Sequence, residues 1–80
     1  MEKFIRAREE FYGQLYEKFL AEDGPYFGMR EIKGLCETNR FIEKAIFFAK
    51  DMGHIQCNRF GGIRLTGPGI LYFEKEYRED

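Results

Sequence analysis

The chain has 80 residues, of which 44% are hydrophobic, 18% aromatic and 34% charged, and its net charge is −1. This size and composition predict one globular domain and exclude a disordered or fibrous chain. The slightly negative charge disfavours a non-specific nucleic-acid coat protein, and a domain this small buries only about 60% of its unfolded surface, which favours oligomerisation as a supplement to the core.

A long amphipathic helix is predicted from Glu2 to Glu22, ended by Gly24-Pro25. Its apolar residues recur at helical spacing: Phe4, Ile5, Phe11, Tyr12, Leu15, Tyr16, Phe19 and Leu20. At 1.5 Å per residue the helix is about 30 Å long, more than a small domain needs. We therefore expect part of the stripe, with Phe11 and Tyr12, to contact a second copy in a homodimer. The alternative is that all these side chains belong to the core.

No apolar run approaches the ~20 residues of a membrane span, and Met1-Glu2-Lys3-Phe4 lacks the apolar core of a signal peptide. Cys36 and Cys57 lie far apart, without the paired spacing of a zinc site or a disulfide framework. We expect a cytoplasmic protein that binds no metal.

Two short elements are predicted next. Tyr26-Phe27 is expected to form a strand against a later hairpin. A second helix should run from Met29 to about Cys36, with Ile32 and Leu35 facing inward and Cys36 acting as a small buried hydrophobe.

A third helix should begin with Thr38 or Asn39 as its N-cap and run to Met52. Its predicted inner face holds Ile42, Ala45, Ile46, Ala49 and Met52, with Phe41 and Phe48 at the edge. The other face carries Asn39, Arg40, Glu43, Lys44, Phe47 and Lys50. Phe47 stands where water is expected, which indicates either a contact surface or a cover supplied by the first helix or the C-terminal tail.

The segment from Gly53 to Gly69 is predicted to be mainly a β-hairpin. Apolar and polar residues alternate on both sides of Gly61-Gly62, the pattern of two half-buried strands joined by a tight turn. Folding about Phe60 pairs Cys57 with Ile63 and Ile55 with Leu65, and places these four side chains on one face. Gln56, Asn58 and Arg64 then lie on the other face.

The last predicted helix covers residues 67–80. Thr66 can cap it and Pro68 suits its first turn, where backbone amides lack partners. Ile70, Phe73 and Tyr77 give it an apolar stripe. Gly67 and Gly69 should allow it close to the hairpin.

A helix ending in Gly53, a two-stranded ribbon with a glycine tip, then Arg64-Leu65-Thr66, Gly69 and a helix resemble the wing region of winged helix-turn-helix domains. The resemblance extends from about Gly28 to Tyr77. It implies an α+β, mainly α fold: a long N-terminal helix (1–23), a helix-turn-helix with its wing (28–66) and a C-terminal helix (67–80).

The resemblance also implies where duplex DNA would bind. The third helix takes the place of a recognition helix, so Asn39, Arg40, Glu43 and Lys44 would face the major groove, where Arg can pair with guanine and Asn with adenine. At the wing, Arg59 and Arg64 would contact phosphate or the minor groove. Residues 28–66 carry seven basic and four acidic side chains, whereas both flanking segments are acidic.

The sequence offers no arrangement typical of catalysis. His54, the single histidine, is expected to be structural, and Glu9-Glu10 is expected on a solvated helix face. The glycines match neither a phosphate-binding loop nor a dinucleotide fingerprint. We expect no catalytic residue and no cofactor.

Two functions remain open. The first is a DNA-binding transcription regulator that acts as a homodimer, favoured by the basic central segment. The second is a winged-helix protein-interaction module, with Phe47, Phe60 and the first-helix aromatic residues as the contact surface, favoured by the acidic balance and the exposed Phe.

Overall fold

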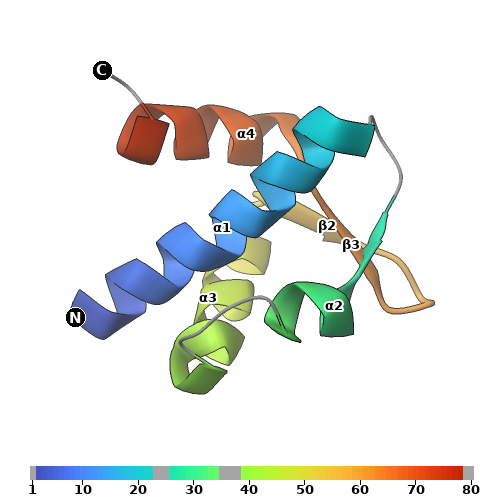
Figure 1. Cartoon of the computed structure of the whole chain (residues 1–80), viewed down its shortest axis with the longest axis horizontal. Helices are drawn as coiled ribbons and strands as arrows, with labels where there is room; N and C mark the ends of the chain where they lie inside the picture. Colours follow the sequence, from blue (N-terminus) through green and yellow to red (C-terminus); the bar gives the residue numbers. More distant parts are fainter. Residues whose placement is uncertain (1, 23–25, 35–38, 79–80) are drawn as a thin grey trace.

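The computed structural model describes residues 2–22, 26–34 and 39–78, which form an α+β fold that is mainly helical (Figure 1). The elements in chain order are α1 (Glu2–Glu22), β1 (Phe27–Gly28), α2 (Met29–Gly34), α3 (Asn39–Asp51), β2 (Ile55–Cys57), β3 (Gly62–Leu65), α4 (Gly67–Phe73) and a π-helical turn, η1 (Glu74–Arg78). The predicted α+β, mainly α class, the long first helix and the short strand before α2 are confirmed. No described helix is both long enough and apolar enough to cross a membrane.

The three strands form one antiparallel sheet in the order β1-β3-β2. The predicted hairpin register is confirmed, because Ile55 pairs with Leu65 and Cys57 with Ile63. Ile55, Ile63 and Leu65 are buried, but Cys57 is exposed, so its predicted place in the buried face was wrong. Ile55 and Cys57 share the edge strand β2, but Cys57 is its last residue and lies next to the exposed hairpin tip, whereas Ile63 has Phe27 on its other side.

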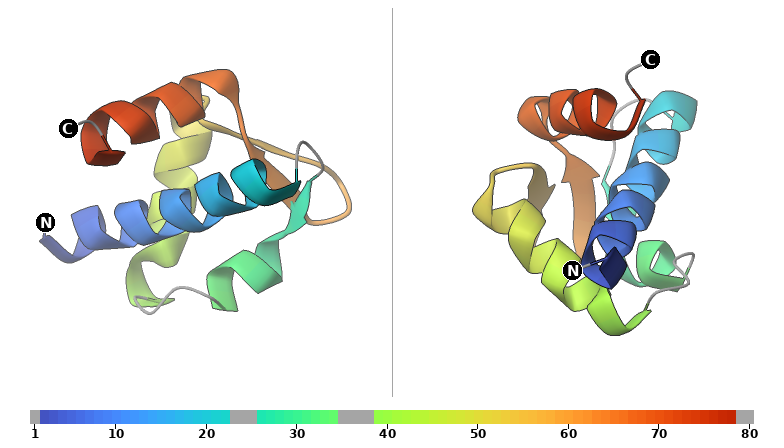
Figure 2. Two further views of the ribbon diagram at one scale, coloured as in Figure 1. Left: turned by 45° about the horizontal axis from the view of Figure 1, so that its top comes forward. Right: turned by 90° about the vertical axis from the view of Figure 1, so that its left-hand side faces the viewer.

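The first helix packs against α2, α3, α4 and β3. In Figure 1 it crosses the middle of the view, with α4 above it and α2 and α3 below it, and the right-hand view of Figure 2 shows it toward one side of the molecule. Phe11 and Tyr12 have 0% exposed surface. The expectation that these two side chains face a second copy was therefore wrong, because packing around α1 from several sides makes them core.

The inner face of α3 follows the prediction for Ile42, Ala45, Ile46 and Ala49, which are all buried. Met52 is 52% exposed, so its predicted place on this face was wrong. Met52 N still donates to the Phe48 carbonyl at 3.0 Å, but Met52 follows the last residue of the helix and Gly53, with a φ of +72°, turns the chain away. The expectations for Leu35, Cys36 and Thr38 lie outside the described residues.

The start of α4 is capped as predicted. Thr66 Oγ1 accepts a hydrogen bond from Gly69 N at 3.2 Å, and Pro68 lies in the first turn. Gly69 permits a close approach to the hairpin, because a Cβ there would lie 2.1 Å from the carbonyl oxygen of His54. Gly67 has no such neighbour within 4 Å, so the same expectation was wrong for it. The predicted C-terminal helix changes to a π-helical turn at Glu74.

Candidate nucleic-acid interface

The outer face of α3 carries exposed charged side chains, among them Glu43, Lys44 and Lys50. Lys33 of α2 donates a hydrogen bond to Glu43, so this carboxylate takes part in an ion pair between α2 and α3. Asn39 and Arg40 belong to the first turn of α3, and their side chains lie outside the described part of the chain. Of the four residues predicted to face a major groove, Glu43 and Lys44 are thus seen on the surface.

Phe47 is 73% exposed on the same helix. Neither α1 nor the described part of the C-terminal segment covers it. Among the described residues, the predicted alternative of a cover from within the chain is therefore wrong. An apolar ring left in water on a charged helix face favours a contact with another molecule.

The hairpin tip is held in one shape by Asn58. Its Oδ1 accepts from Phe60 N at 2.9 Å and from Gly62 N at 2.7 Å, while Asn58 N donates to the Gly62 carbonyl at 3.0 Å. Gly61 supplies the positive φ of +81° that the turn requires. An Asn followed three and four residues later by glycine is a turn signal that could have indicated this geometry from sequence.

The tip is also fastened to the body of the domain. Met29 N, at the start of α2, donates to the Gly61 carbonyl at 2.9 Å. At Gly62 a Cβ would lie 2.8 Å from the Cβ of Tyr26, so the backbones on either side approach closely. The hairpin reaches the outer edge of the molecule (Figure 1; Figure 2, left), yet its base and tip have fixed partners.

The two arginines of the hairpin have different surroundings. Arg59 is exposed at the tip, with its guanidinium carbon 5.3 Å from the ring centroid of Phe60, which is itself 83% exposed. Arg64 donates from Nη2 to Gln56 Oε1 at 2.7 Å and lies 5.6 Å from the ring centroid of Tyr26. Arg59 is therefore the better placed of the two to contact a ligand.

The charge of the hairpin segment has one sign. Between Asp51 and Glu74 the sequence contains Arg59 and Arg64 and no acidic residue. The hairpin segment is therefore positive although the chain as a whole is slightly negative. This local charge favours an anionic partner at the tip.

A second group of polar side chains lies inside the molecule. The Tyr12 hydroxyl and His54 Nδ1 are hydrogen bonded at 2.6 Å, and the His54 ring stacks on Tyr72 with centroids 4.5 Å apart. Arg8 Nη1 donates to the Tyr72 hydroxyl at 3.0 Å. Burial lowers the pKa of His54, raises the pKa of Tyr12 and raises the pKa of Tyr77 to about 12. Sequence reasoning missed this network, because its members lie far apart in the sequence and no local pattern joins them.

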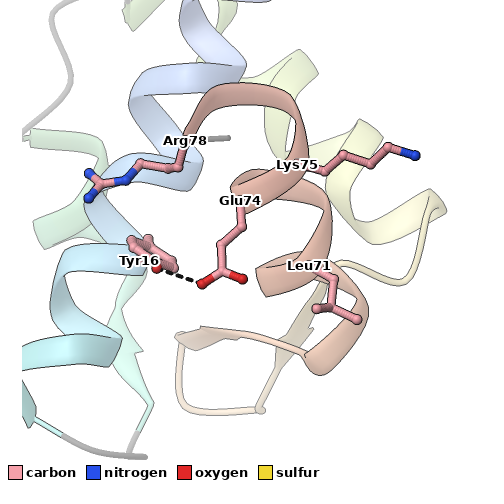
Figure 3. A pocket seen from close by; sticks show the side chains of 5 residues that line it. All are labelled: Tyr16, Leu71, Glu74, Lys75 and Arg78. Atoms are coloured by element: carbon pink, nitrogen blue, oxygen red, sulfur yellow. Dashed lines mark hydrogen bonds between the residues drawn. The ribbon is translucent and has the colours of Figure 1, made fainter. Parts of the chain in front are cut away.

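An open pocket lies between α1 and the C-terminal helix (Figure 3), lined by Tyr16, Leu71, Glu74, Lys75 and Arg78. The Tyr16 hydroxyl donates to Glu74 Oε2 at 2.7 Å, and this hydrogen bond raises the pKa of Tyr16. The Tyr16 hydroxyl and the Glu74 carboxylate are therefore hydrogen-bond partners, and their contact joins the C-terminal helix to α1.

Within residues 2–22, 26–34 and 39–78, no three His, Cys, Asp or Glu side chains are grouped so that they could hold a metal ion. Comparisons of the chain with protein-family models, curated proteins and solved structures found no match. The geometry of the outer α3 face and the hairpin tip is therefore the basis for a functional proposal.

Proposed function

We propose that the chain is a winged-helix domain that binds duplex DNA and acts as a transcription regulator. The order helix, strand, helix, helix, strand, strand, helix supports this assignment, together with the pairing of β1 beside β3 in a small antiparallel sheet. In this proposal α3 enters the major groove and the hairpin tip contacts the adjacent backbone or minor groove. Such a function requires no catalytic group and no cofactor.

The observation that carries the proposal is the hairpin tip. It is fixed by hydrogen bonds from Asn58 and Met29, it bears the exposed Arg59, and its segment contains no acidic residue. A rigid, positively charged projection suits a polyanion, because little conformational entropy is lost when it binds. Lys44 and Lys50 on α3 add further cations.

We also propose that the regulator is a homodimer, with a contact surface different from the one expected around Phe11 and Tyr12. Leu20, near the end of α1, is 62% exposed, and Leu71 of α4 is 68% exposed beside the pocket that Tyr16 lines. Sedimentation of the Leu20→Glu/Leu71→Glu variant tests this surface: it should be a monomer where the parent is a dimer. A parent that sediments as a monomer at micromolar concentration contradicts the dimer.

A protein-interaction module is the second candidate. The exposed rings of Phe47 and Phe60 favour it, because apolar rings at the surface are common in protein contacts. In that case Phe47→Ala would weaken the complex with a protein partner, and the parent would not bind duplex DNA.

Two substitutions test the DNA proposal. Arg40→Ala should reduce binding by about 1–3 kcal/mol and relax the preference for one base pair, because the proposal places Arg40 against a base. Arg59→Ala should weaken binding to all sequences similarly, because a phosphate contact carries no sequence information. If Arg40→Ala binds every duplex as well as the parent, α3 is not the reading helix.

A further inference from the structure

We propose that Phe60 is an apolar wedge that enters the minor groove, opens the stack between two base pairs and bends the DNA, while Arg59 neutralises the phosphates beside it. The inference deepens the proposed function and rests on it. It assigns to the hairpin tip a mechanical role that a phosphate contact alone would not have.

Among the described residues, neither the core nor the side chains packed against it include Phe60. Its ring is 83% exposed, whereas Ile63, three residues later in the same hairpin, is fully buried. Removing the ring from Phe60 would therefore take little from the stability of the fold. Single exposed apolar rings are common on protein surfaces. Phe60 differs in having a fixed turn beneath it and a cation beside it, and a ligand that covers the ring would use all three features.

The backbone under Phe60 is rigid enough to insert a side chain. Phe60 N donates to Asn58 Oδ1 at 2.9 Å, and the next residue, Gly61, accepts from Met29 N at 2.9 Å. The turn is thus held from within by Asn58 and from outside by the start of α2. A loosely held ring would fold back on contact with DNA, whereas a ring on a fixed turn keeps its direction.

Arg59 selects a nucleic acid as the ligand for this ring. Its guanidinium lies 5.3 Å from the centroid of the Phe60 ring, so a cation and an apolar ring project from the same turn. A base step combines these features, because its flat apolar faces lie between two rows of phosphates. Proteins that bend DNA from the minor groove combine Arg or Lys with an inserted apolar side chain in this way.

The wedge predicts where on a site the tip should lie. Pyrimidine–purine steps such as TA and CA are the easiest to unstack, so the cost of insertion is smallest there. The base step under the wing should therefore be a pyrimidine–purine step, even though Phe60 makes no hydrogen bond to a base edge.

The experiment measures DNA bending by energy transfer between dyes at the two ends of a duplex, with 2-aminopurine at the central step as a reporter of unstacking. The full-length parent should bend a duplex with a central TA step by about 20–90° and raise the 2-aminopurine fluorescence. Phe60→Ala should still bind, with lower affinity, and should lose both signals. Phe60→Leu should retain them in part, because Leu also serves as a wedge.

Phe19→Ala is the control, since it removes a partly exposed ring from α1, outside the proposed DNA surface, and should leave the bend unchanged. Circular dichroism of Phe60→Ala should match that of the parent. A parent that binds DNA without bending it, or a Phe60→Ala variant that bends it as before, overturns the wedge and leaves the DNA-binding function intact. A parent that binds no duplex contradicts both. Loss of self-association in Phe60→Ala without any change on DNA identifies the tip as a protein contact and also overturns the wedge.

Discussion

His54 holds its imidazole among aromatic rings from three helices: Tyr12 of α1, Phe48 of α3 and Tyr72 of α4. Only 5% of the residue is exposed, and its Nδ1 is hydrogen bonded to the Tyr12 hydroxyl at 2.6 Å. The expected structural role agrees with this position. Its partner lies 42 residues away in sequence, so no local pattern could have identified Tyr12.

Protonation of His54 should destabilise the fold. Burial lowers its pKa below the usual 6.5, so the unfolded chain binds this proton more readily than the folded chain does. The free energy of unfolding should therefore fall as the pH drops below about 6.5, and this contribution should level off below the folded-state pKa. Urea denaturation between pH 7.5 and 5 measures it, above the range in which ordinary carboxylates titrate, at about pH 4.

The control for this measurement replaces both partners of the hydrogen bond. His54→Phe/Tyr12→Phe leaves no unpaired polar atom at the contact and no titrating imidazole. The double variant should keep its unfolding free energy nearly constant between pH 7.5 and 5. An equal decrease in the parent and the double variant would assign the effect to other groups.

Gly69 should be the more sensitive of the two glycines at the start of α4. A Cβ at Gly69 would lie 2.1 Å from the His54 carbonyl oxygen. That oxygen belongs to the backbone, so it cannot move aside as the end of a flexible side chain could. Gly69→Ala should therefore cost about 1–3 kcal/mol or more of unfolding free energy, as overpacking does. Gly67→Ala, which meets nothing within 4 Å, is the matched control. Thermal melts in which both variants lose the same stability would contradict the close approach.

At the scale of elements, the predictions that depended on local chemistry were the accurate ones. The Thr66 cap, the hairpin register and the bounds of the first helix follow from short patterns in the sequence. The errors concern the surroundings of an element. The packing of neighbours around α1 decides the burial of Phe11, and the position of Cys57 at the end of its strand, beside the hairpin tip, accompanies its exposure. Helical and strand periodicity carry neither kind of information.

The two faces of α3 should respond differently to alanine. Ile46 is buried against the core, so Ile46→Ala should leave a cavity and cost about 2–5 kcal/mol of unfolding free energy. Lys44 is exposed, so Lys44→Ala should change stability by no more than about 0.5 kcal/mol. Chemical denaturation measures both. Equal losses would mean that the inner face of the helix has been assigned wrongly.

For the whole molecule, the sequence was sufficient for the α+β, mainly α class and insufficient for the contacts of the exposed charged residues. The apolar periodicities and glycine positions predicted the number and order of the main elements. They could not show that Arg64 is engaged by Gln56 while Arg59 remains at the tip, because that difference depends on contacts across the hairpin. Nor could they show that Glu43 is paired with Lys33 of another helix.

DNA binding measured across a salt series tests the proposed function of the molecule most directly. Each phosphate neutralised by Lys or Arg contributes a log–log slope of about −0.9 on B-DNA. Because the described part of the α3 face and the hairpin tip offers few cations, among them Lys44, Lys50 and Arg59, the parent should bind at low salt with a shallow slope. Lys44→Ala should reduce the steepness of that slope by about 0.9. Micromolar protein that shifts no duplex from a mixture of genomic fragments at low salt would contradict the DNA-binding function.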